Sequence, residues 1–115
     1  MFKKNNNLLG VMAEYFVIIL YIMFLYKLLY HRMRYYIGEI DLVMVRGRTV
    51  VFIEVKFRSQ ITYLDTALRE QQKLRIKKSA ELFLMRYKQY QSYNIRFDLA
   101  LLSPYKIPRI IKNAW

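Results

Sequence analysis

The chain has 115 residues and carries 20 lysines and arginines against 8 aspartates and glutamates, which gives a formal net charge of +12. The length fits one domain, and 56% hydrophobic residues suffice for its core. The absence of cysteine excludes disulfides and thiolate metal sites, one histidine cannot build a histidine-rich zinc site, and three glycines leave no phosphate-binding loop. The excess of positive charge indicates a polyanionic partner, either nucleic acid or an anionic membrane surface.

The first third of the chain combines a basic, polar start with a long apolar run. We expect residues 1–12 to form a tail and a single domain to span residues 13–115. Twelve consecutive apolar or aromatic residues occupy positions 15–26, between Glu14 and Lys27. A membrane-spanning helix needs roughly 20 apolar residues, so this run predicts a buried core helix.

No small-residue cleavage site follows the apolar run, which argues against a signal peptide and predicts a cytoplasmic protein. The helix is nevertheless unusually apolar, so peripheral membrane association and a hydrophobic dimer surface stay open as alternatives. The single histidine, His31, is expected in a strand or at the surface, without a catalytic role.

Two runs rich in β-branched residues, 40–45 and 49–55, predict a pair of strands. The two residues between Arg46 and Thr49 begin with Gly47, which suits a tight hairpin loop. We therefore expect Arg46 to pair with Thr49 across an antiparallel hairpin.

Counting outward from this loop places Asp41 opposite Glu54 and Glu39 opposite Lys56, with all four side chains on one face. Opposed carboxylates lie roughly 4.5 to 5.5 Å apart at Cβ and repel unless a cation or a proton lies between them. Oxygen ligands suit Mg²⁺ or Mn²⁺. Lys56 beside such an ion would act on the attacking water or on charge that builds on a phosphate. The pattern indicates metal-assisted phosphodiester hydrolysis.

The alternative is that these charges form the solvated face of a hairpin, with Glu39 and Lys56 as a cross-strand ion pair. The residues between the charges are apolar at successive positions, however, which is typical of strands covered on both faces. Acidic groups in such a sheet are costly unless they are paired or bind a metal. This consideration favours the metal site.

The second half predicts a loop that runs into a long amphipathic helix within residues 62–90, with Asp65 as a plausible N-cap. Its basic residues, Lys73 among them, interleave with apolar ones. That basic face would lie against DNA phosphates or would simply be solvated.

A further strand is expected at residues 94–102, where Asp98 would cap or pair with Arg96 rather than bind metal. Two prolines then break regular structure, and residues 107–111 could form a last edge strand. The whole chain therefore predicts an α/β domain of order α-β-β-β-α-β, with a mixed central sheet flanked by helices and this edge strand as an optional addition.

Four segments of the chain resemble one bacterial family. They are Gly-Glu-Ile-Asp-Leu at 38–42, Phe-Ile-Glu-Val-Lys-Phe-Arg at 52–58, Arg-Phe-Asp at 96–98 and Ile-Lys-Asn-Ala-Trp at 111–115. On these segments the chain, from about Ala13 onward, is similar to the YraN-like proteins. The resemblance implies a restriction-endonuclease-like fold of the PD-(D/E)XK superfamily, near the archaeal Holliday-junction resolvases.

The resemblance also implies roles for particular residues. Asp41, Glu54 and Lys56 match the signature acid, acid and lysine, and Glu14 matches an early helix glutamate that completes the metal site. The main-chain carbonyl of Val55 would add a ligand.

Further residues would support these in auxiliary roles. Glu39 would be an outer or second-metal carboxylate or would only orient Lys56, and Gln72, like its neighbour Gln71, lies where the superfamily often carries an active-site auxiliary. Arg58 would contact a phosphate, and Arg34, which matches a strand-end arginine, would also bind nucleic acid.

Two departures from the family pattern fall in the first helix. Val17 and Ile18 stand where alanines are usual, and Leu25 stands where a glycine normally ends the helix.

We therefore expect a DNA nuclease dependent on Mg²⁺ or Mn²⁺, with branched DNA as one substrate class. A homodimer is a further expectation, because junction-cutting enzymes of this superfamily work as dimers. Two alternatives remain open: a non-catalytic nucleic-acid-binding module of the same fold, and a membrane-associated protein that uses the apolar helix.

Overall fold

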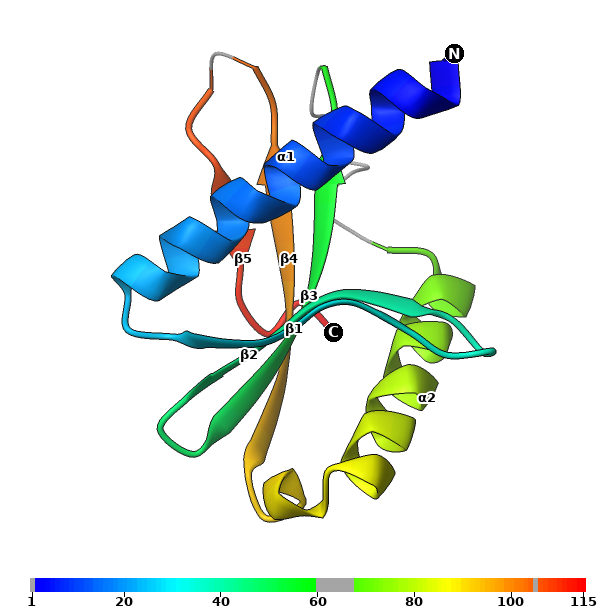
Figure 1. Ribbon diagram of the computed structural model, residues 1–115, viewed down its shortest axis with the longest axis vertical. Coiled ribbons are helices and arrows are strands. Elements are labelled where there is room, and N and C mark those ends of the chain that lie inside the picture. Colours follow the sequence, from blue (N-terminus) through cyan, green and yellow to red (C-terminus); the bar gives the residue numbers. More distant parts are fainter. Residues whose placement is uncertain (1, 60–67, 105) are drawn as a thin grey trace.

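The computed structural model describes residues 2–59, 68–104 and 106–115. Figure 1 shows the elements, which follow the chain in the order α1 (Phe2–Met23), β1 (Lys27–Arg34), β2 (Glu39–Arg46), β3 (Thr49–Phe57), α2 (Glu70–Arg86), the short 3-10 helix η2 (Lys88–Tyr90), β4 (Asn94–Leu102) and β5 (Arg109–Ile111). This confirms the predicted α/β class and element order, with β5 as the additional edge strand.

The five strands form one mixed sheet in the order β1-β2-β3-β4-β5. All neighbours are antiparallel except β3 and β4, which run parallel and are connected through α2. Arg46 pairs with Thr49, as the hairpin prediction requires. Gly47 has a φ of 57°, the left-handed conformation that the first position of this loop needs.

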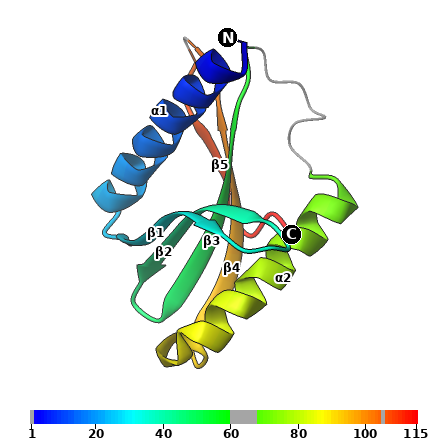
Figure 2. The ribbon, with the colours of Figure 1, turned by 45° about the vertical axis from the view of Figure 1, so that its right-hand side comes forward.

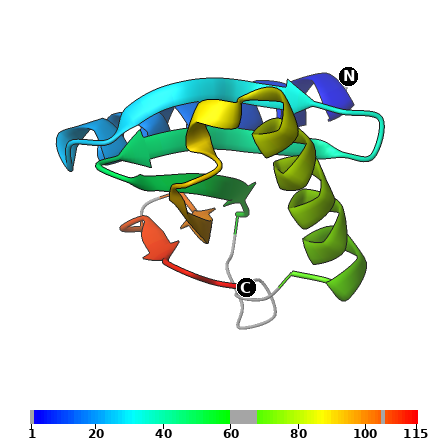
Figure 3. The same cartoon turned by 90° about the horizontal axis from the view of Figure 1, so that it is seen from below.

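The two long helices cover opposite faces of the sheet, as the views in Figures 2 and 3 show. Strand β3 supplies side chains to both layers in alternation. Val51 and Ile53 belong to the buried cluster that includes α1, whereas Val50 and Phe52 belong to the cluster that includes α2. The prediction that these strands are covered on both faces is confirmed.

Helix α1 begins at Phe2 rather than at the expected start near Ala13, so residues 2–12 are helical where a tail was expected. Nothing in that stretch stops a helix, because it contains no proline and only one glycine. Among the described residues, no helix has the length and hydropathy that crossing a bilayer requires.

The end of α1 is a Schellman motif centred on Leu25. The backbone N–H of Leu25 donates to the carbonyl of Ile22 at 2.9 Å, and that of Tyr26 donates to the carbonyl of Tyr21 at 3.0 Å. Leu25 adopts a φ of 71° there, a conformation that favours glycine. This geometry fits the glycine that the family resemblance leads us to expect at the position.

Helix α2 has Arg69 as its N-cap, with no side-chain capping bond. The proposed cap, Asp65, lies outside the described residues. The helix ends at Arg86, before the predicted limit at residue 90, and the 3-10 helix η2 follows Tyr87.

Asp98 is fully buried and anchors three parts of the chain. Its carboxylate accepts two hydrogen bonds of 2.9 Å from Arg96, one of 2.8 Å from the hydroxyl of Tyr21 on α1 and one of 3.0 Å from the backbone N–H of Asn113. The prediction that Asp98 pairs with Arg96 is confirmed.

Candidate metal centre

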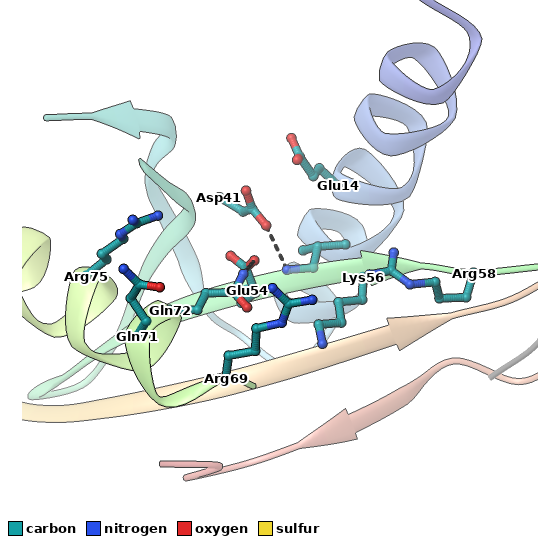
Figure 4. A pocket seen from close by; sticks show the side chains of 10 residues that line it. Glu14, Asp41, Glu54, Lys56, Arg58, Arg69, Gln71, Gln72 and Arg75 are labelled. Atoms are coloured by element: carbon teal, nitrogen blue, oxygen red, sulfur yellow. Dashed lines mark hydrogen bonds between the residues drawn. The ribbon is translucent and has the colours of Figure 1, made fainter. Parts of the chain in front are cut away.

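Asp41 and Glu54 come together where strands β2 and β3 begin to separate. The last residues paired across these strands are Leu42 and Ile53, so the two carboxylates follow directly beyond the end of the ladder. Their carboxyl groups are close enough for each to shift the pKa of the other. Asp41 Oδ2 also accepts a hydrogen bond of 2.8 Å from the backbone N–H of Val55, drawn as a dashed line in Figure 4.

Burial is the main cause that raises the pKa of both carboxyls above the ordinary range. The negative charge of Asp41 raises the pKa of Glu54 further, so Glu54 is the more perturbed of the two. Without a cation, such a pair keeps a proton at neutral pH. A divalent cation bound between the two carboxylates would displace that proton.

Gln72 connects the pair to α2, because its Nε2 donates a hydrogen bond of 2.9 Å to Glu54 Oε2. The predicted auxiliary residue thus contacts one of the predicted metal ligands. The amide fixes one oxygen of Glu54 and leaves the other for a cation.

A pocket of about 850 Å³ opens over these groups (Figure 4). It contains the three carboxylates Glu14, Asp41 and Glu54 together with four cationic side chains, which are Lys56, Arg58, Arg69 and Arg75. Acidic groups beside a set of cations suit a phosphate that binds through a metal ion and through direct ion pairs.

Glu14 lines this pocket from α1, but its carboxylate is held by two residues of β1. His31 Nε2 lies 2.6 Å from Glu14 Oε1, and Arg32 Nε donates to the same oxygen at 2.9 Å. Adjacent residues of a regular strand point to opposite faces. Arg32 has a φ of 58°, which breaks that alternation and lets both side chains reach Glu14.

Other predicted site residues lie apart from the pocket lining. Glu39 is paired with Arg34 across the β1–β2 hairpin at 2.7 Å, so the expected position of Glu39 opposite Lys56 is wrong. The reason is that the end of β2 that contains Glu39 pairs with β1 and no longer with β3. Lys73 contacts Glu70 of its own helix at 3.2 Å.

The donor set fits a metal bound by two carboxylates. Among the described residues, no group of three acidic, histidine or cysteine side chains is arranged to hold an ion. Mg²⁺ is often bound by one or two carboxylates and keeps several waters, so the pair Asp41 and Glu54 is sufficient for it. The third carboxylate, Glu14, is engaged by His31 and Arg32 instead.

Sequence reasoning missed several residues that shape the site. Arg69 and Arg75 were recognised only as part of a basic helix, although Arg75 follows Gln71 and Gln72 at the spacing of one helical turn. His31 and Arg32 gave no signal, because their contact with Glu14 depends on an irregular strand.

These features define an α/β protein with a paired-carboxylate pocket rimmed by cations. The family model described as "Uncharacterised protein family UPF0102" matches residues 13–102, and the chain belongs to this family. The resemblance to the YraN-like proteins is thereby confirmed.

Three relatives illustrate the similarity. A UPF0102 protein of Parvibaculum lavamentivorans is 35% identical over 107 residues, which covers 93% of this chain and 80% of that protein. A UPF0102 protein of Ehrlichia ruminantium is 34% identical over 109 residues, covering 95% and 84%. One of Paramagnetospirillum magneticum is 41% identical over 78 residues, covering 68% and 60%.

Proposed function

We propose that this protein is a nuclease of the PD-(D/E)XK type that hydrolyses phosphodiester bonds in DNA with Mg²⁺ or Mn²⁺. The observation that carries the proposal is the pair Asp41 and Glu54, two interacting carboxyls with raised pKa values that line one pocket together with four cationic side chains. Lys56 lies two residues beyond Glu54 on the same strand and lines the same pocket. This is the acid, acid and lysine arrangement that the sequence resemblance implies.

Each residue then has a distinct task. Asp41 and Glu54 would hold the ion, with the Val55 carbonyl as a further candidate ligand, and the bound ion would supply Lewis acidity and a more acidic water. The Val55 N–H fixes Asp41 and the Gln72 amide fixes Glu54, so both ligands are pre-oriented.

The cations of the pocket act on the substrate. Arg58, Arg69 and Arg75 would bind phosphate oxygens of the backbone and hold the scissile group over the carboxylates. Lys56 would orient the attacking water and offset charge on the phosphate. The water oxygen forms a bond to phosphorus, the bond to one ester oxygen breaks, and that leaving oxygen takes up a proton.

The experiment is cleavage of labelled linear, single-stranded, flap and four-way-junction DNA, and of one RNA, with Mn²⁺ and with EDTA. Wild type is compared with Asp41→Ala and Lys56→Ala. We expect metal-dependent cleavage that both substitutions abolish. Cleavage that persists in either variant would refute the assigned roles.

A second candidate is a non-catalytic nucleic-acid-binding module of the same fold. The observation that favours it is the engagement of Glu14 by His31 and Arg32, which leaves a site of only two carboxylates. This module would bind DNA in a salt-sensitive way, and binding would survive Asp41→Ala. Tight binding without cleavage of any substrate would select this candidate.

A further inference from the structure

Helix α1 is apolar on both sides. Its inner side chains, such as Val17 and Tyr21, are buried against the sheet. Its outer side carries large apolar residues that expose between 50% and 71% of their surface, namely Leu8, Met12, Tyr15, Ile19, Ile22 and Met23. A helix that is apolar all round is normally covered on both sides.

The exposed surface continues past the end of the helix. Phe24 and Leu25 are 65% and 82% exposed. Beyond them, Ile107 in the connection between β4 and β5 is 91% exposed. Phe24 and Ile107 line one groove, and we call these exposed apolar residues, together with those on the outer side of α1, the α1 face. Clusters of exposed large apolar side chains mark a contact with another protein or with a membrane.

Two grooves border the α1 face, and each contains one lysine. A groove of about 330 Å³ lies between Phe24 and Ile107, with Lys112 in its lining. A groove of about 480 Å³ lies beside Met12, with Lys106 in its lining. All other residues that line these two grooves are uncharged.

Acidic groups are absent from the α1 face within the part of the chain that the structure describes. Glu14 and Asp98 are buried, and Glu70 and Glu81 belong to α2, on the opposite side of the sheet. The remaining described carboxylates line the two pockets around the candidate metal centre, and they are Glu39, Asp41 and Glu54. A further cation reaches the edge of the face, because Arg46 donates a hydrogen bond of 3.0 Å to the carbonyl of Phe24.

We propose that the α1 face adsorbs to the surface of a membrane that contains anionic phospholipids. Helix α1 would lie in the plane of the membrane, with its outer side chains at the boundary of the acyl chains and with Lys106 and Lys112 at the lipid phosphates. A second copy of the chain is a poorer occupant, because two faces rimmed by cations on molecules of net charge +12 repel each other. This inference does not depend on the nuclease proposal.

The test is co-sedimentation of the full chain with vesicles of phosphatidylcholine alone and of phosphatidylcholine mixed with phosphatidylglycerol, at low and at high salt. The variant is Ile19→Glu, and its matched control is Met85→Glu on α2, since these residues are 57% and 66% exposed. The two substitutions change the net charge equally. An uncharged variant, Ile19→Ser, separates loss of apolar contact from added charge, and circular dichroism checks that each variant is folded.

We expect wild type to sediment only with the anionic vesicles. Ile19→Glu should lower the partition coefficient about tenfold, because it removes one isoleucine that would be buried in the membrane. Ile19→Ser should lower it as well, and Met85→Glu should change it by less than about twofold. Equal losses in Ile19→Glu and Met85→Glu would overturn the proposal, as would the absence of vesicle binding. A dimer in light scattering that Ile19→Glu dissociates, without vesicle binding, would identify a second copy as the occupant instead.

Discussion

The side chain of Gln72 donates a hydrogen bond of 2.9 Å to Glu54 Oε2, which joins the first turn of α2 to a carboxylate of β3. A ligand held in this way keeps one defined orientation, and removal of such a partner typically weakens metal binding 10–100-fold.

Gln72→Leu should therefore raise the Kd for Mn²⁺ about 10-fold or more, without unfolding the protein. Calorimetric titration measures the change. Gln91→Leu makes the same exchange at a glutamine that donates to the carbonyl of Leu84 and does not line the pocket, so its Kd should match wild type. Equal weakening in both variants would show that Gln72 does not orient Glu54.

Glu54→Gln should stabilise the metal-free protein in a pH-dependent way. Burial, as the main cause, raises the pKa of Glu54 from about 4.5 to about 9. The folded state then binds more protons than the unfolded state between these values, so this carboxyl lowers stability as pH rises through that window. The variant should gain about 1 kcal/mol or more in free energy of unfolding at pH 8 and nothing near pH 4.

Urea denaturation at the two pH values measures this difference. Glu81→Gln on α2 is the control and should show no gain at either pH. A gain for Glu54→Gln that is the same at pH 4 and pH 8 would mean that charge burial is not its cause.

Leu25→Gly should stabilise the protein by about 0.5–1 kcal/mol, because Leu25 has a φ of 71° and is 82% exposed. Met23→Gly, two residues earlier and within the helix, should instead cost about 0.5–1 kcal/mol. Thermal unfolding of both variants measures the contrast. Destabilisation by Leu25→Gly would contradict the assigned Schellman geometry.

Asp98→Ala should destabilise the protein by about 3–5 kcal/mol, because it leaves the guanidinium of Arg96 without its carboxylate. The double variant Asp98→Ala with Arg96→Met should recover part of that loss. Chemical denaturation of the single and double variants gives the coupling energy. Additive losses would show that the two residues do not act as a buried pair.

Arg75→Ala should weaken DNA binding and reduce the slope of log K against log salt concentration by about 1, as expected for one lost phosphate contact. Arg86→Ala, at the other end of the same helix, is the matched control. Fluorescence anisotropy at several salt concentrations measures both slopes. Identical slopes for the two variants would show that Arg75 does not contact a DNA phosphate.

The hairpin and the approach of Asp41 to Glu54 could be predicted because Gly47 fixes the loop and the side-chain alternation of a strand fixes the rest. The same counting of paired positions gave the wrong partner for Glu39, two residues before Asp41. There β2 pairs with β1, so Glu39 meets Arg34 rather than Lys56. Counting residues outward from the loop is valid only while the two strands remain hydrogen-bonded, and the sequence does not indicate where that pairing ends.

The contact of Glu14 with His31 and Arg32 could not be predicted, because it depends on the positive φ of Arg32. Arginine rarely adopts a positive φ, so its presence at position 32 does not indicate this conformation. The early start of α1 was missed for a different reason. Polar residues at 3–7 suggested a tail, although polarity alone does not prevent helix formation.

The metal site is tested most directly by a calorimetric titration of Mn²⁺ into wild type, Asp41→Asn and Glu54→Gln at pH 7 in buffers of different ionisation enthalpy. We expect one saturable site in wild type, with release of a proton as the ion replaces the proton held by the pair Asp41 and Glu54, and loss of that site in both variants. Unchanged Mn²⁺ binding in the variants, or no saturable binding in wild type, would show that Asp41 and Glu54 do not form a metal site.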